Sequence, residues 1–398
     1  MKKMNIKITA LLAAFVLLFN TPIFAEGKKD LGINGSYYKQ LVQMKDVVAD
    51  ILPPPAYIIE AYLTVLRIVD EMEKGMADGA LDDAEKKTIN EFIDYGNKLK
   101  DGAPGLFPGY FERIDHWAKD LSEATPEDKQ LKDWLVSKSV EPAKQFFDIR
   151  DNKFNALAKA GDVKGAKKIV RDELKKAYQA HRNAIDVVVS RSRTVNAKIE
   201  KEVADKLTAA GGEVTDDVLI KSPLYTKVIQ MKDVVSDILP PPAYIIESYL
   251  TVLQLIDETE IALTDGTIDG REKAEINRLI EWGRQLKEGA SAKDELPGYF
   301  ERQGFWTTDL SDSTPEEKNI KELMIYLSAD PAKKFFEIRD SKFIPLIQGN
   351  DVEGSKKVAR EELLPLYNDH RKHIDSLVIA ANKRYETVEK QVNSLLTQ

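Results

Sequence analysis

The chain has 398 residues, no cysteine, and 58 basic against 66 acidic residues, which gives a formal net charge of −8. The absence of cysteine excludes a disulfide scaffold, a thiol enzyme, a c-type cytochrome and a lipoprotein anchored through cysteine. The acidic balance gives no electrostatic basis for binding nucleic acid, and the length predicts two domains.

Residues 1–25 have the three parts of a secretory signal peptide. Lys2, Lys3 and Lys7 form a basic start, and an apolar run of 12 residues, 8–19, leads to a short segment that ends in Ala25. Twelve residues are too few to cross ~30 Å of hydrocarbon as a helix, which favours a cleaved signal over a membrane span. We therefore expect a periplasmic or secreted bacterial protein that is not embedded in the membrane after cleavage.

The next feature is a stretch that the chain contains twice. Residues 43–71 and 230–258 are identical at 24 of 29 positions, at a constant offset of 187. An internal repeat of this length indicates a tandem architecture. We predict one helical module over residues 26–210 and a second over residues 211–398.

Three consecutive prolines stand inside each repeated stretch, at positions 53–55 and 240–242. Proline fixes φ at about −65°, lacks an amide donor and pushes the preceding residue out of the α region. The helix that enters from Met44 is therefore expected to stop or bend sharply near Leu52. A second helix is expected from about Ala56 to Lys74, because proline suits a first helical turn and apolar residues recur there at helical spacing.

Further helix signals follow in chain order. Residues 83–99 predict a helix, and Thr125, followed by proline and two acidic residues, predicts the start of another that ends at Gly161. Asp162 is placed to cap a last helix over residues 163–207, about 45 residues and so ~65 Å long. The second copy repeats these signals at Thr314, Gly349 and Asp351.

The sequence contains no alternating, β-branched strand pattern of useful length. We therefore predict an all-α protein with two tandem up-and-down bundles. Each bundle has four main helices, a proline-kinked first helix, a long last helix and extra short helical segments.

The run KDVVADILPPPAYIIE, residues 45–60, resembles the start of the extracytoplasmic helical sensor domain of a group of bacterial methyl-accepting chemotaxis receptors. The resemblance continues through residues 110–117, 142–147, 161–162 and 178–186, and it covers nearly all of each copy. In that family the module lies between two membrane spans and precedes cytoplasmic signalling helices. Here two modules follow a signal peptide without such regions, so the resemblance implies a sensing or ligand-binding module.

Two glutamates on the repeated arms are candidates for a ligand site. Glu60 and Glu247 each follow two isoleucines on an otherwise apolar arm. A buried carboxylate needs a partner, whereas a glutamate on a helix edge would be solvated, and the sequence leaves both readings open. The repeated basic residues are possible partners, or possible ligands for a bound carboxylate.

Repeated aromatic residues could line a pocket beside the prolines or form the core, and the conserved arm could itself be a packing junction. The proposed ligand contacts are Tyr57, Glu60, Arg113, Trp117, His181 and Arg182 in the first copy and Tyr244, Glu247, Arg302, Trp306, His370 and Arg371 in the second.

Metal binding and catalysis have little support in the sequence. Only His181 and His370 are shared by the copies, so no cluster of metal or haem ligands repeats. Residues 78–85 resemble the back half of an EF-hand loop, but the front half is missing, which favours a helix-to-helix turn. No paired-carboxylate, Ser-His-Asp or glycine-loop signature is present. We predict no catalytic residues, no metal and no cofactor.

Two functions fit these features. The first is an exported sensory protein that binds a small molecule, with a carboxylate or amine, between helices near the kink, where the ligand shifts the angle between the arms. The second is a structural or protein-interaction module of the cell envelope, which docks a membrane-bound sensor or another envelope protein and binds no small molecule.

Overall fold

The computed structural model describes residues 32–33, 35–51, 58–105, 107–209, 220, 222, 225–226, 229–230, 232–233, 245–264, 267–290 and 297–396. These residues are helical apart from turns, short connecting segments and isolated bridge residues such as Ala103 and Phe107, which confirms the all-α fold class. The predicted signal peptide, the triple prolines, Tyr57, Tyr244 and the module boundary at residues 210–211 lie outside the described residues, so the module division stays a prediction.

The helices of the first copy are α3 (Ser36–Ile51), α4 (Ile59–Gly75), α5 (Asp83–Asp101), α6 (Tyr110–Asp120), α7 (Pro126–Asp133), α8 (Val140–Ile149), α9 (Asn155–Ala160), α10 (Val163–Ile169) and α11 (Lys175–Ala209). Those of the second copy are α13 (Ile246–Ala262), α14 (Gly270–Glu288), α15 (Tyr299–Asp309), α16 (Pro315–Glu322), α17 (Ala329–Ile338), α18 (Ile344–Gln348), α19 (Val352–Val358) and α20 (Leu364–Leu396). A short 3-10 turn, η1 (Met76–Asp78), follows α4.

The ends of these helices follow the local signals closely. α3 ends at Ile51, as the prolines predict. α4 begins at Ile59 and not at Ala56, because Ile58 has a ψ of 18° and only caps the helix. Thr125 and Asp162 cap their helices through their side chains, as predicted.

α9 and α18 both end at the glycine that the sequence predicts, but the two glycines differ in backbone conformation. Gly161 ends α9 in the left-handed region with a φ of 72°, but Gly349 has a φ of −84°. The left-handed residue of the second copy is Asn350, with a φ of 61°. Asparagine tolerates this region better than most residues, because its short side chain can bond to nearby backbone.

Each copy has three π-helical turns at equivalent positions, and sequence periodicity did not predict them. In the first copy they are η2 (Trp134–Lys138), η3 (Arg150–Phe154) and η4 (Val170–Leu174), and in the second η5 (Leu323–Leu327), η6 (Arg339–Phe343) and η7 (Ala359–Leu363). They join α7 to α9 and α10 to α11 into two long helices, so the last helix of the first copy spans residues 163–209. π-turns are common at functional sites.

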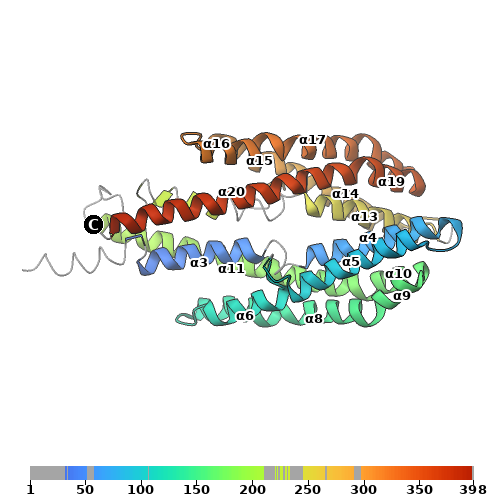
Figure 1. Cartoon of the computed structure of the whole chain (residues 1–398), viewed down its shortest axis with the longest axis horizontal. Coiled ribbons are helices and arrows are strands. Elements are labelled where there is room, and N and C mark those ends of the chain that lie inside the picture. Colours follow the sequence, from blue (N-terminus) through green and yellow to red (C-terminus); the bar gives the residue numbers. More distant parts are fainter. Residues whose placement is uncertain are drawn as a thin grey trace, which may run out of the picture.

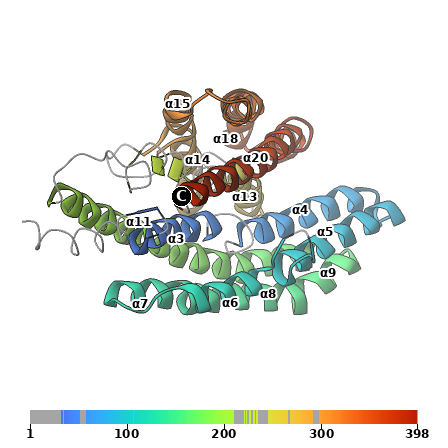
Figure 2. The ribbon, with the colours of Figure 1, turned by 60° about the vertical axis from the view of Figure 1, so that its left-hand side comes forward.

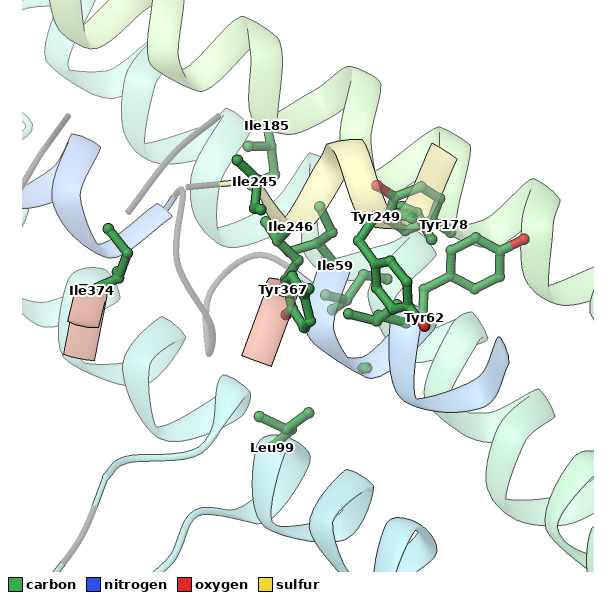
Figure 3. Close-up of a cluster of buried hydrophobic side chains, with 14 of the residues drawn as sticks. Ile59, Tyr62, Leu99, Tyr178, Ile185, Ile245, Ile246, Tyr249, Tyr367 and Ile374 are labelled. Atoms are coloured by element: carbon green, nitrogen blue, oxygen red, sulfur yellow. The ribbon is translucent and has the colours of Figure 1, made fainter. Parts of the chain in front are cut away.

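The two copies lie side by side, with the first copy's helices along one side and the second copy's along the other (Figure 1). α3 packs against α11, and α4 packs against α13 of the other copy. Figure 2 shows α3 and α11 side by side in a second view. Around the contact between α4 and α13 lie two pairs of stacked aromatic rings, Tyr62 with Tyr178 and Tyr249 with Tyr367, at centroid distances of 4.5 and 4.9 Å (Figure 3).

The loop between α5 and α6 depends on two glycines. Gly102 has a φ of 90°, and a Cβ on Gly109 would lie only 2.2 Å from the Gly102 amide nitrogen. In the second copy a Cβ on Gly298 would lie 2.1 Å from the nitrogen of Gly289. This backbone contact explains why both copies resume at Pro-Gly-Tyr-Phe after loops of different length.

Replacement of Gly109 or Gly298 by alanine is expected to lower the free energy of unfolding by about 2 to 3 kcal/mol, because two backbone segments must separate. The control is Gly304→Ala in α15, where no heavy atom lies within 4 Å of the added Cβ. Alanine there should be neutral or stabilise by up to about 1 kcal/mol. Urea unfolding followed by circular dichroism measures both, and equal effects at the three sites would contradict this account.

Candidate functional site

The surface between the two copies carries ion pairs that are partly buried and that occur twice with the copies exchanged. We call it the inter-copy interface and define it by these pairs. The charged residues that pair across it are Lys45 with Asp233, Lys232 with Asp46, Arg371 with Glu60, Arg182 with Glu247, and Lys167 and Lys356 with both Glu73 and Glu260. The exchange gives the interface an approximate two-fold character, like that of an isologous dimer.

One of these pairs joins Glu60 on α4 to Arg371 on α20. Glu60 is only 4% exposed, so it is not a solvated glutamate on a helix edge. Nη2 of Arg371 lies 2.9 Å from Oε1 and 3.0 Å from Oε2 of the carboxylate. The Tyr95 hydroxyl also donates to Glu60, and Arg371 donates to that hydroxyl at 2.9 Å. The carboxylate of the first copy's arm is thus neutralised by the second copy.

The counterpart pair joins Glu247 on α13 to Arg182 on α11. Glu247 is 3% exposed, and Nη2 of Arg182 donates to its Oε2 at 3.2 Å. Trp282 stands where the first copy has Tyr95, and the Arg182 guanidinium lies 4.7 Å from its ring centroid. A cation–π contact here takes the place of the phenol hydrogen bond.

Four charges meet near the centre of the interface. Nζ of Lys167 lies 2.6 Å from Glu73 and 2.5 Å from Glu260, and Nζ of Lys356 lies 3.0 and 3.2 Å from the same carboxylates. Burial lowers the pKa of each lysine, but the two carboxylates outweigh it, so the pKa of both is raised. Each lysine therefore stays charged, and each links both copies.

A small cavity lies beside this cluster. Its volume is about 40 Å³, and its walls include Leu66 and Val69 of α4, Leu253 and Ile256 of α13, and the carboxylate of Asp257. That volume suits one or a few water molecules. Small-molecule pockets are commonly about 300 to 1,000 Å³, so an organic ligand does not fit here without movement of the helices.

The interface departs from two-fold symmetry at several positions, and one of them is the carboxylate of Asp257. Nε of Arg360 donates to Asp70 at 2.7 Å. Asp257 is the counterpart of Asp70, but Arg171, the counterpart of Arg360, donates to Asp172 instead, at 3.0 Å. Burial raises the pKa of Asp257 to about 6. The charged groups that act on it are Lys167 and Lys175, which lower its pKa, and Glu258 and Glu260, which raise it.

Other predicted contacts lie inside the two bundles. His181 and His370 are fully buried, and their Nδ1 atoms lie 2.8 and 2.7 Å from the carbonyl oxygens of Ser139 and Ser328. Each serine directly follows a π-turn, so the histidines fix those turns to the last helix.

The remaining predicted residues lie elsewhere. Trp117 and Trp306 are buried in the core. Burial lowers the pKa of both Arg113 and Arg302, while Asp46 raises that of Arg113 and Asp233 that of Arg302. Of the predicted site, the structure brings together Glu60 with Arg371 and Glu247 with Arg182, in each case across the copies.

The central cluster and the aromatic residues beside the arginines were not predicted from the sequence. The cluster left a signal, because Glu73 and Glu260 are identical at an offset of 187, and Lys167 and Lys356 at an offset of 189. Tyr95 gave no such signal in the sequence, since Trp282 replaces it in the other copy.

No family model, curated protein or solved structure matches this chain. Among the described helices, none is long and apolar enough to cross a membrane. Within the described part of the chain, no three His, Cys, Asp or Glu side chains are grouped so that they could hold a metal ion.

Replacement of Arg371 by methionine is expected to cost about 3 kcal/mol or more of unfolding free energy, because it leaves a buried carboxylate without its cation. The double variant Glu60→Gln with Arg371→Met should regain a large part of that loss. Urea unfolding of the two single variants and the double variant gives their coupling energy.

The control is the exposed ion pair Lys201–Asp205, whose side chains are 77% and 67% exposed. Lys201→Ala should cost less than about 1 kcal/mol. Additive effects of the Glu60 and Arg371 changes would show that this pair does not join the copies.

Asp257 predicts a pH dependence. Its folded-state pKa lies above the unfolded value of about 3.9, so the folded protein binds this proton more tightly and loses stability as the pH rises from about 4 through about 6. Asp257→Asn should therefore stabilise the protein by about 1 to 2 kcal/mol above pH ~7 and have no effect below pH ~4.

The matched control is Asp70→Asn, which removes the partner of Arg360 and should destabilise the protein at neutral pH. Urea unfolding across this pH range measures both variants. A gain for Asp257→Asn that is the same at every pH would rule out titration of this carboxylate as its cause.

Proposed function

We propose that this protein is an exported sensory protein that binds a small molecule, and that its two copies act as one built-in pair. The observation that carries the proposal is the exchange of buried ion pairs across the copies. Glu60 and Glu247 stand on the arms that follow the prolines, and their arginines stand on the long last helix of the other copy. A change in one arm therefore acts directly on the other copy.

Buried ion pairs suit a role in coupling the two copies better than a role that is purely stabilising. Their desolvation offsets much of the attraction, and one attested use of such pairs is to select a single arrangement of the parts they join. A protein with two arrangements of the arms responds to a ligand by a shift of population, limited by the ligand's difference in affinity for the two. The long helices α11 and α20 would carry that shift out of the modules.

Glu60, Arg371, Glu247 and Arg182 are assigned to coupling in this proposal and not to ligand contact. The cavity at the interface is only about 40 Å³. The ligand is proposed to lie between helices within a copy, where larger space is present.

A docking function is the second candidate, and a specific observation favours it. The second copy exposes Tyr326 by 62% and Ile379 by 70%, where the first copy has Ser137 and Ser190. Leu327 is also exposed and replaces Lys138. Exposed apolar side chains on only one of two homologous surfaces are consistent with a protein partner for that copy.

Thermal unfolding of the purified protein against amino acids, organic acids, amines and nucleobases tests the proposal. A ligand that binds only the folded state adds about 2.7 kcal/mol at a hundredfold excess over its Kd. We expect at least one compound to raise the midpoint.

In the Arg371→Met variant, if it remains folded, the same compound should still bind, since Arg371 is assigned to coupling. If the protein is folded and no compound of the panel raises the midpoint of thermal unfolding, the docking function is favoured. Capture of an envelope protein by the unchanged chain, and its loss on Tyr326→Ser with Leu327→Lys, would then establish that second function.

A further inference from the structure

We propose that the second copy contains a ligand pocket between α13, α14 and η6 that takes a small, mostly apolar molecule with a carbonyl or carboxylate oxygen bound to Arg339. This inference rests on the proposed sensory function and names its site and ligand class. The pocket has a volume of about 270 Å³, close to the lower end of known small-molecule sites.

The walls of the pocket are mostly apolar. Val252 and Leu255 come from α13, Leu279 and Ile280 from α14, and Ile344 from α18. These side chains would contact the apolar body of a ligand. Two carboxylates, Asp340 and Glu288, and a second guanidinium, Arg284, also line the pocket, and each carboxylate is paired with one of the two arginines.

Arg339 supplies the polar contact. It is only 5% exposed, and its Nη1 donates to the Gly283 carbonyl at 2.7 Å. Nε and Nη2 both contact Oδ1 of Asp340, at 2.7 and 2.6 Å. A guanidinium has five N–H donors, so these contacts leave two donors on a buried side chain that lines the pocket.

The first copy shows what the second has lost. Arg150 is the counterpart of Arg339, and it makes the same contacts to Gly96 and Asp151. Its Nη2 also donates to Oδ1 of Asn97, at 3.3 Å. Arg284 replaces Asn97 in the second copy and instead contacts two glutamates on its own helix. An acceptor that the first copy provides from its own chain is therefore absent at Arg339.

The same comparison accounts for the space. In the first copy, Cζ of Arg67 lies 4.5 Å from the ring centroid of Phe92. Leu279 stands at the position of Phe92 in the second copy. Asn155 is replaced by Ile344, which makes that wall apolar. Thr64 and Val65 are unchanged as Thr251 and Val252. Leu279 thus leaves space that Phe92 would fill, and the exchange of Asn97 for Arg284 removes an acceptor next to a guanidinium that both copies share, which together would make room for a ligand oxygen.

The test is isothermal titration of the full chain with benzoate and isovalerate and with the corresponding amides. We expect binding by at least one probe of either kind, and the comparison of acid with amide tells whether the oxygen must carry charge. Leu279→Phe restores the first copy's side chain and fills the pocket, so it should weaken binding at least tenfold.

Ile344→Asn, on a half-buried wall, is a second variant that should also weaken binding, and it keeps the test valid if Leu279→Phe fails to fold. Phe92→Leu, the reverse change in the first copy, is the matched control and should not weaken it. Circular dichroism checks that each variant is folded.

Absence of binding by all four probes overturns this inference, and so does binding that neither pocket variant changes. The two proposals fail separately. A compound from the thermal panel that binds equally well to wild type and to Leu279→Phe would support the sensory function and refute this pocket.

Discussion

A buried carboxylate must be neutralised, and in this protein each copy neutralises the carboxylate of the other. Glu60 and Glu247 are almost fully shielded from water, and their cations, Arg371 and Arg182, belong to the opposite copy. Removal of one partner while the copies stay together would leave a buried charge uncompensated, at a cost of several kcal/mol. The paired arrangement is therefore part of the fold of each copy, which gives a physical reason for the near identity of the two arms.

Outside that constraint the copies have diverged, and part of the divergence falls on residues beside the interface. Arg360 binds Asp70, whereas Arg171 leaves Asp257 without the equivalent bond. Tyr95 became Trp282, and a hydrogen bond to the carboxylate became a ring contact to the arginine. Such changes keep the approximate two-fold arrangement and alter the chemistry of one half.

Local features of this fold were predictable, because short-range physics determines them. Thr125, Asp162 and the prolines place helix ends through the backbone groups of their immediate neighbours. The π-turns were not predictable, since residues such as Trp134 and Arg339 keep the ordinary helical spacing of apolar residues. Only the backbone hydrogen bonds shift there by one residue. The partner of Glu60 was equally beyond the sequence. Several repeated basic residues fitted, and spacing along the chain does not tell which copy supplies the cation.

The position of α13 connects the proposed pocket to the interface. Thr251 lines the pocket, and its hydroxyl donates to the carbonyl of Glu247 one turn earlier, at 2.7 Å. The side chain of that glutamate binds Arg182 on α11 of the first copy. A ligand that changes the position of α13 therefore changes the geometry of a buried ion pair. Such a pair does not deform gradually, because a small separation exposes a charge to an apolar environment. The same contact that holds the copies together would turn a local displacement in one copy into a discrete change at the long helix of the other.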